Sequence, residues 1–325
     1  MGPVFPGWGP NQLTMKANRK LCFAAAVLMA VAGTVPAMIA RSYAHKLLTN
    51  PLLEREVPKV TPAHFKLPFT ELLITNQGGL RLAGWYVPSS NRAAIMAQHG
   101  YKKCRQEMLP AAALLHRHGY GVLLTSVRAH DQSEGEQISF GLREMEDLEA
   151  WHTYLRTRND VDPDRIGALG NSMGASLVIQ FAATNAHIKA VVADSPFSSL
   201  RETVSTSVTH FTGLPSFPFA PMIYFWAEVE SGYRFSQVDP KLWIRRISPR
   251  PVLVLQGGAD RTVSSRSGEL LYTAAAEPKE LWYEPLTDHA RFVTNMPAYE
   301  QRVVGFFDKH LSPNRVPTEL RGVAP

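Results

Sequence analysis

Short apolar runs alternate with longer amphipathic runs through most of the chain. The short runs end in polar or glycine-rich loops, which is typical of buried strands, and the longer runs have helical periodicity. Strands are expected at 71–75, 80–86, 93–97, 119–124, 165–169, 190–193, 251–256 and 280–283. Helices are expected at 108–116, 142–157, 173–184, 265–275 and 298–309. This alternation predicts an α/β fold with a mostly parallel sheet flanked by helices on both faces.

The segment Gly170-Asn171-Ser172-Met173-Gly174 lies between an apolar run and a helical run. A serine that attacks a carbonyl has to project from a sharp strand-to-helix turn, and flanking glycines remove the Cβ atoms that would collide there. Ser172 is therefore the candidate nucleophile.

A serine hydroxyl needs a base to take its proton and an acid to orient that base. Asp260 follows the expected strand 251–256 and is the candidate acid, although aspartate beside glycine is also common in turns. His289 follows the next expected strand and is the candidate base. Asp194, at the end of the strand 190–193, is the alternative acid, or else a cap for the following helix.

The order Ser172, Asp260, His289 resembles the triad of α/β-hydrolase serine hydrolases, including membrane-anchored esterases and S33-like peptidases. The resemblance covers about residues 70 to 310. The stretch 128–135 is similar to the family's R-G-H-G-x-S loop, but Ala129 and Asp131 stand where glycines are usual, and Ser126 where an aspartate is frequent.

The resemblance also implies an oxyanion hole, in which two backbone N–H groups face the developing negative charge. In this family one donor lies after the strand that here ends in Gln98-His99-Gly100-Tyr101, and the other belongs to the residue after the nucleophile. The donors implied in this chain are the N–H groups of Tyr101 and Met173.

About fifty residues interrupt the alternation at 195–247, too many for a plain connection in a compact domain. We expect a helical cap here. Its aromatic residues either form the cap's own core or line an apolar acyl pocket over Ser172, with Phe219, Phe225 and Trp226 as the candidate lining residues.

The amino-terminal part lies outside the expected catalytic domain. Residues 21–40 carry no charge and are long enough to cross a bilayer as a helix, so they predict a transmembrane anchor, with a cleaved signal peptide as the alternative. Flanking basic residues favour a catalytic domain on the non-cytoplasmic side, and cleavage would give a secreted or periplasmic protein. The expected organisation is a basic tail at 1–20, in which Met15 is a second candidate start, the anchor at 21–40, a linker at 41–62, the catalytic domain at 63–312 and a tail at 313–325.

Composition agrees with an ordered enzyme, because 45% of the residues are hydrophobic and 19% are charged. The net charge of +6 does not indicate nucleic-acid binding, since the basic residues are scattered and no nucleic-acid-binding motif appears.

We expect no cofactor and no metal, because neither a dinucleotide fingerprint nor metal-ligand spacing is present. Cys22 falls in the apolar segment, which leaves Cys104 without a disulfide partner. The oligomeric state stays open.

Together these features predict a serine hydrolase that cleaves carboxylic esters, with a small or lipid-like ester as substrate. A peptidase or amidase of the same fold is the alternative within the class. A non-catalytic binding module on this fold is the alternative outside it.

Overall fold

The computed structural model describes residue 2 and residues 12–312, with side chains described at 2, 21–25 and 33–312. The predicted tail 313–325 and residues 3–11 of the predicted tail 1–20 lie outside the described residues. An eight-stranded sheet in the order β1-β2-β4-β3-β5-β6-β7-β8 forms the centre of the domain. The strands are β1 Thr70–Thr75, β2 Arg81–Val87, β3 Ala94–Gln98, β4 Gly121–Thr125, β5 Ile166–Asn171, β6 Ile188–Asp194, β7 Val252–Gly257 and β8 Lys279–Glu284.

Strand direction divides the sheet into two parts. The pairs β1–β2 and β2–β4 are antiparallel, and every later pair is parallel, from β4–β3 to β7–β8. Strands β3 to β7 are almost entirely buried because helices cover both of their faces. The prediction of a mostly parallel sheet flanked by helices is confirmed.

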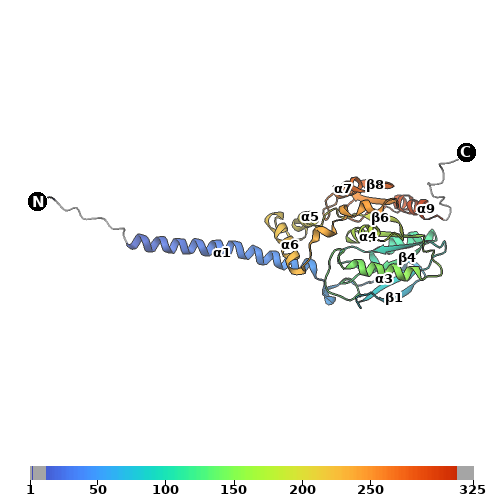
Figure 1. Cartoon of the computed structure of the whole chain (residues 1–325), viewed down its shortest axis with the longest axis horizontal. Coiled ribbons are helices and arrows are strands. Elements are labelled where there is room, and N and C mark those ends of the chain that lie inside the picture. Colours follow the sequence, from blue (N-terminus) through green and yellow to red (C-terminus); the bar gives the residue numbers. More distant parts are fainter. Residues whose placement is uncertain (1, 3–11, 313–325) are drawn as a thin grey trace.

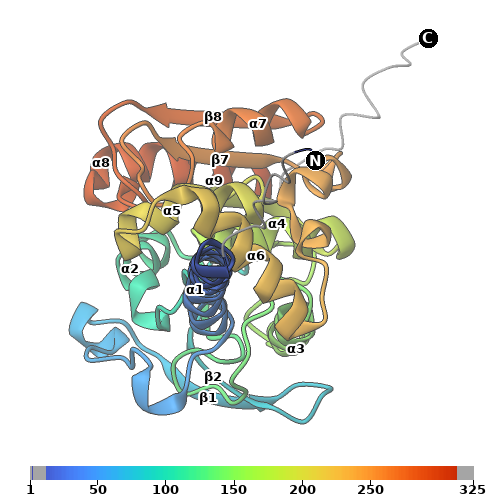
Figure 2. The same ribbon diagram turned by 90° about the vertical axis from the view of Figure 1, so that its left-hand side faces the viewer.

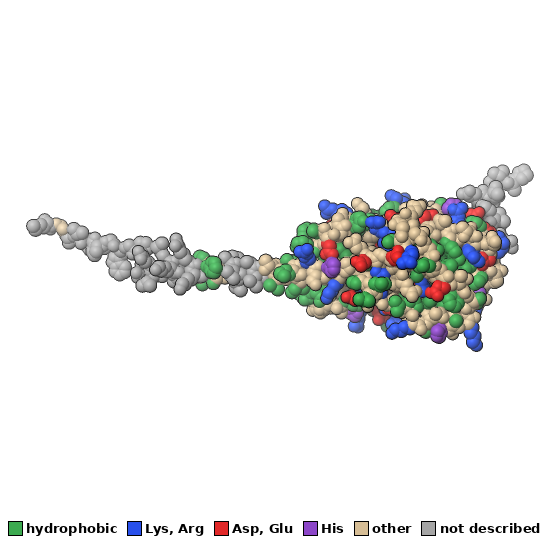
Figure 3. All heavy atoms as spheres, turned by 90° about the horizontal axis from the view of Figure 1, so that it is seen from below, with side chains coloured by type: hydrophobic (Ala, Val, Ile, Leu, Met, Phe, Trp, Pro, Cys, Tyr) green, Lys and Arg blue, Asp and Glu red, His purple; other side chains and the backbone are tan. Residues whose placement is uncertain are grey.

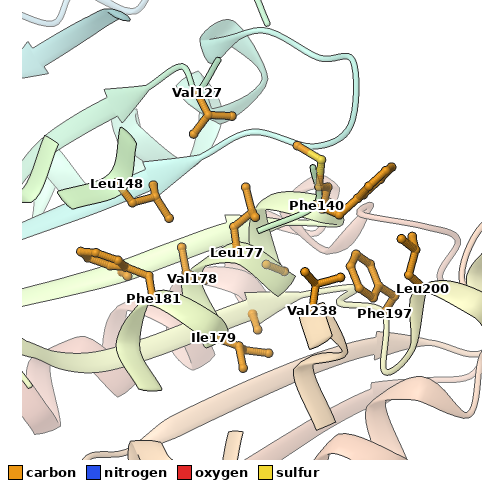
Figure 4. Packing of buried hydrophobic residues seen from close by; sticks show 14 of the residues in the cluster. Val127, Phe140, Leu148, Leu177, Val178, Ile179, Phe181, Phe197, Leu200 and Val238 are labelled. Carbon is orange, nitrogen blue, oxygen red and sulfur yellow. The ribbon is translucent and has the colours of Figure 1, made fainter. Parts of the chain in front are cut away.

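The sheet separates the apolar core into two clusters, one on each of its faces, and helices cover both. One cluster contains the apolar face of α4, and Figure 4 shows Leu177, Val178, Ile179 and Phe181 of this helix among their neighbours. The flanking helices are α2 Leu109–Arg117, α3 Glu144–Arg156, α4 Met173–Thr184, α7 Ser267–Ala274, α8 Met296–Tyr299 and α9 Gly305–Leu311. A π-helical turn at Glu300–Val304 joins α8 to α9, where the sequence predicts one continuous helix. Short 3-10 helices lie at Leu52–Glu54, Pro62–Phe65, Arg105–Met108, Phe235–Val238, Pro240–Leu242, Ile244–Ile247 and Phe292–Thr294.

The insert at 195–247 is helical, as expected for a cap. It contains α5 Leu200–Thr212 and α6 Ser216–Ser231, which pack against each other. Gly213 and Gly232 end these helices with φ of 71° and 73°, a left-handed conformation that costs glycine little.

A long amino-terminal helix, α1 Gln12–Leu48, projects from the domain beside α5 and α6 (Figures 1 and 2). Its last turns pack on α6 and bury Ala40, Ala44 and Leu48. The helix is also held by a 2.5 Å contact between His45 Nδ1 and a carboxylate oxygen of Glu230. Residues 41–48 of the expected linker at 41–62 thus continue α1, where small apolar residues fit against the cap.

No helix among the described residues is both long enough and apolar enough to cross a membrane. The side chains of residues 26–32, inside the predicted anchor 21–40, lie outside the described part. Apolar side chains gather where α1 joins the domain, and basic and acidic side chains are interspersed on the face shown in Figure 3.

Candidate active site

Ser172 stands in the sharp turn between β5 and α4. Its backbone has a positive φ of 53° with ψ of −116°, a combination that non-glycine residues rarely adopt. A Cβ added at Gly170 would lie 2.3 Å from the Gly174 carbonyl oxygen, and one at Gly174 would lie 2.4 Å from the oxygens of Gln98 and His99. Both glycines of the motif are thus required by close backbone approach. The Ser172 N–H donates to the Asp194 carbonyl at 2.8 Å, which ties the turn to β6.

The structure brings Ser172, His289 and Asp260 together from three separate loops. The distance from Ser172 Oγ to His289 Nε2 is 2.7 Å, and that from His289 Nδ1 to Asp260 Oδ2 is also 2.7 Å. The other oxygen of Asp260 accepts the N–H groups of Thr262 and Val263, each at 2.9 Å. Because a carboxylate only accepts, Nδ1 carries the proton and Nε2 is left to accept the serine proton.

Asp194, the alternative acid, has different partners. Its Oδ1 accepts the Ser195 hydroxyl at 2.9 Å, and Ser195 Oγ in turn accepts the N–H of Ala290 at 2.9 Å. Asp194 therefore supports the backbone next to His289, and neither of its oxygens contacts the ring. Complete burial raises the pKa of Asp194 to about 7, against the opposing effects of the Ser195 hydrogen bond and the nearby His289. This geometry favours Asp260 over Asp194 as the orienting acid.

The two implied oxyanion donors flank Ser172. Gly100 lies so close that a Cβ there would be 3.4 Å from Ser172 Cβ. The Gly100 N–H is used by Glu107, at 2.7 Å, whereas the N–H groups of Tyr101 and Met173 donate to no acceptor within the described part of the chain. Unused N–H groups next to a serine hydroxyl can receive the negative oxygen of a tetrahedral intermediate.

The loop 128–135 has positive φ at the two positions where similar proteins usually have glycine. Ala129 and Asp131 have φ of 59° and 54°, the left-handed conformation that glycine adopts most easily. The Ser126 hydroxyl donates to Asp131 at 2.7 Å, so a carboxylate is still present beside position 126. Arg128 holds the loop through three hydrogen bonds to the buried Asp147, from its backbone N–H at 2.8 Å and from its guanidinium at 2.7 and 2.9 Å. Asp147 could not be recognised from the sequence, because its partner Arg128 lies on a separate loop before α3.

A cavity of about 320 Å³ lies beside Ser172 between the sheet, the cap and α1. Its lining is mostly apolar and includes Tyr43, Leu47, Tyr101, Phe140, Met173, Phe197, Leu200, Val204, Val208, Phe211, Ile223 and Val263. Phe140, Phe197 and Leu200 are among the apolar side chains drawn together in Figure 4.

The expectation that Phe219, Phe225 and Trp226 line the acyl pocket is wrong. Ile223 is the residue of α6 that lines the cavity. The side chain of Phe225 is 57% exposed, and Trp226 contacts Arg41 of α1. Since helix faces repeat every 3.6 residues, Phe225, two positions after Ile223, points away from the cavity. Trp226, three positions after Ile223, is nearer the same side of the helix but is covered by Arg41 of α1. The aromatic residues of the insert 195–247 that line the cavity are Phe197 and, on α5, Phe211.

Among the described residues, no group of three ligand-type side chains could hold a metal ion. The chemistry available at the site is proton transfer from Ser172 to His289, with attack of the serine oxygen on a carbonyl carbon.

Fold and site together define an α/β-hydrolase with a serine nucleophile motif. A model of the prolyl oligopeptidase family matches residues 125–314, and one of the X-Pro dipeptidyl-peptidases (S15 family) matches residues 32–217. Because each match spans more than half of the chain, the chain belongs to the prolyl oligopeptidase family and its S15-like relatives, a group of hydrolases.

Two relatives extend over most of the chain. YqkD, an uncharacterized protein of Bacillus subtilis, is 28% identical over 297 residues, which are 87% of this chain and 97% of the relative. Rv2307c, an uncharacterized protein of Mycobacterium tuberculosis, is 30% identical over 283 residues, 85% of this chain and 90% of the relative. Among solved structures, the Pyrococcus furiosus esterase Pf2001 superposes with a TM-score of 0.67 at 25% identity, covering 79% of this chain and 98% of the esterase.

Proposed function

We propose that the protein is a serine esterase that cleaves carboxylic esters through an acyl-enzyme on Ser172. One observation carries the proposal. The Ser172 hydroxyl, which is hydrogen-bonded to His289, lies at the wall of an apolar cavity of about 320 Å³. Such a cavity has room for an acyl chain, and its apolar lining matches one.

In the proposed reaction Ser172 Oγ attacks the ester carbonyl while His289 Nε2 takes the hydroxyl proton. Asp260 keeps the ring in the required tautomer and stabilises the imidazolium that forms. The N–H groups of Tyr101 and Met173 receive the oxyanion. His289 then gives its proton to the leaving alkoxide, and a water molecule activated by the same nitrogen hydrolyses the acyl-enzyme.

The peptidase alternative has one specific support, which is that both matching family models describe peptidases. Against it, no aspartate or glutamate lines the cavity within the described part of the chain, so nothing there would pair with the ammonium group of a peptide amino terminus. The resemblance to a solved esterase also favours ester substrates.

The test is a parallel assay of 4-nitrophenyl esters with acyl chains of increasing length and of aminoacyl and X-Pro 4-nitroanilides, using the full chain in detergent. The proposal predicts turnover of the esters that rises with chain length and is lost in Ser172→Ala. Turnover of the anilides alone would establish the peptidase. A chain that hydrolyses neither and takes no fluorophosphonate label would be a binding module.

The proposal also includes a membrane tether at residues 21–40, with the catalytic domain on the non-cytoplasmic side. The uncharged sequence supports it, as do the exposed side chains of Leu21, Phe23 and Met38, each at least 70% exposed. The full chain should then resist carbonate extraction from membranes, whereas a chain beginning at Gly33 should be recovered in the soluble fraction. A mature protein beginning at Met38 or Arg41 would establish signal cleavage instead.

A further inference from the structure

The cavity beside Ser172 has charge on one side only. Lys46 and Lys102 are the charged residues among the described side chains that line it, and the remaining lining is apolar or hydroxyl-bearing. Lys46 lies in the last turn of α1, and Lys102 lies on the loop after β3, directly after Tyr101. A cavity with an apolar wall and a cationic wall suits a ligand that has an apolar part and a negatively charged part.

The two lysines come from distant parts of the chain and are held next to each other. The Lys102 ammonium donates to the Lys46 carbonyl at 2.8 Å. The Tyr101 hydroxyl donates to the Leu47 carbonyl at 2.9 Å, and its ring stacks on Phe140 with centroids 5.7 Å apart. These contacts fasten the loop after β3 to the end of α1.

Neither lysine has a carboxylate within ion-pair distance in the described part of the chain. The adjacent Lys103 differs, because its ammonium pairs with Glu56 at 3.0 Å. Burial lowers the pKa of Lys102, and the positive charge of Lys46 acts in the same direction, while Glu54 opposes both. An anion placed between the two ammonium groups would attract both of them and so offset their mutual repulsion.

A purely structural role explains only part of this arrangement. Lys102 caps a carbonyl at the end of α1, where a cation is favourable. An ammonium has three donors, however, and that hydrogen bond uses one of them. The Lys46 ammonium makes a cation–π contact 5.5 Å from the centre of the Tyr43 ring and donates no hydrogen bond within the described part of the chain.

We infer that the substrate is an anionic single-chain ester, with its acyl chain among the apolar cap residues and a phosphate or carboxylate of its alcohol part between Lys46 and Lys102. This inference rests on the proposed esterase function and specifies the substrate class. Ser172, Lys46 and Lys102 line the same cavity, so one ligand can contact both the serine hydroxyl and the two ammonium groups.

The test compares hydrolysis of 1-decanoylglycerol, 1-decanoylglycerol 3-phosphate and 1-decanoylglycerol 3-phosphocholine by the full chain in detergent. The measured quantity is the ratio of kcat/KM for the phosphate ester to that for the neutral ester. In the parent this ratio should exceed one and fall as salt is raised, because screening weakens ionic contacts. The kcat/KM for the phosphocholine ester should fall between those for the other two esters. This ester has the phosphate but no net charge, so it distinguishes an effect of net charge from recognition of the phosphate itself.

Lys46→Gln and Lys102→Gln should each lower the ratio about fivefold, and the double variant about tenfold or more, as expected for partly exposed ion pairs. Lys102→Arg should retain most of the ratio. Lys103→Gln is the matched control, since it removes a charge from the same loop outside the cavity, and it should leave the ratio unchanged. The rate of fluorophosphonate labelling reports whether each variant is folded.

An unchanged ratio in a folded double variant, or a parent that prefers the neutral ester at every salt concentration, would overturn the inference while leaving the esterase standing. A parent that hydrolyses none of the three esters and no 4-nitrophenyl ester would instead remove the proposed function itself.

Discussion

Two walls of the same cavity are built by different kinds of contact. On one wall lies Ser172, which is joined through His289 to Asp260 by hydrogen bonds of 2.7 Å, and the Asp260 side chain has no exposed surface. On the other wall, α1 packs on α6 of the cap, and Ala44 and Ile223 of these two helices belong to one apolar cluster. Polar contacts depend steeply on distance and angle, whereas apolar packing depends on area and volume. Removal of a single hydrogen-bonding atom from the first wall should therefore greatly reduce activity. A change of one side chain in the second wall should alter stability or acyl-chain preference in proportion to the volume changed.

The largest effect is expected at the nucleophile. Ser172→Ala should lower kcat by about 10⁴-fold or more and abolish fluorophosphonate labelling without loss of fold. Because the hydrogen-bonded residues act as a unit, adding His289→Ala should scarcely deepen the defect. Ser205→Ala, on the exposed side of α5, is the control. Losses that add in the double variant would mean that Ser172 and His289 work separately.

The two aspartates should differ sharply. Asp260→Asn removes the acceptor for His289 Nδ1 and should lower kcat by about 10³-fold or more, since it favours the wrong tautomer. Asp194→Asn keeps an acceptor for the Ser195 hydroxyl and should cost less than about tenfold, the effect of a single indirect contact. Steady-state kinetics on one ester measures both variants, and the reverse order would assign the acid to Asp194.

Asp194 should also affect stability as pH changes. Its pKa is about 7 in the folded chain, against 3.8 as the reference value, so its stabilising contribution is present below pH 4 and is lost as pH rises through 7. Between pH 5 and pH 8 the parent should lose about 2 to 3 kcal/mol of unfolding free energy relative to Asp194→Asn, at about 1.4 kcal/mol per pKa unit. Urea unfolding of both chains at the two pH values measures this difference. Parallel pH profiles would show that Asp194 is ionised throughout.

The packing of α1 should respond to volume. Ala44 is fully buried against the domain, so Ala44→Leu should cost about 1 to 3 kcal/mol of unfolding free energy through overpacking. Ser42→Leu introduces the same side chain two residues earlier at an exposed position, and its stability should stay close to that of the parent. Thermal unfolding of the full chain in detergent compares the two. Equal stabilities would mean that α1 is not packed on the domain in solution.

The smallest expected effect concerns acyl-chain length. Each methylene placed in the cavity should favour binding by up to about 0.8 kcal/mol until the cavity is full. Val208→Phe adds volume to a lining position and should move the optimum toward shorter acyl chains. Val229→Phe makes the same change at an exposed position of α6 and should leave the optimum in place. A chain-length series of 4-nitrophenyl esters gives the profiles, and an optimum unmoved by Val208→Phe would place the acyl chain elsewhere.

The sequence was most informative where a residue type has few alternatives. Gly170 and Gly174 are required because any Cβ there would overlap backbone, so the turn around Ser172 could be recognised from the motif. The strand pattern likewise placed Asp260 and His289 after successive strands, since parallel strands present their carboxyl ends at one edge of the sheet. It left Asp260 and Asp194 as alternatives, because both follow buried strands.

Tertiary structure decided what depends on the rotation of a helix or on contacts between distant segments. Aromatic composition identified the cap, but whether Ile223 or Phe225 faces the cavity depends on how α6 rotates against α1 and α5. The same packing brings Lys46 beside Lys102. Local sequence determined the strands, the turn at Ser172 and the order of the reactive residues because steric limits on the backbone act over a few residues. The lining of the cavity and its charge came from contacts between segments far apart in the chain, which local pattern does not encode.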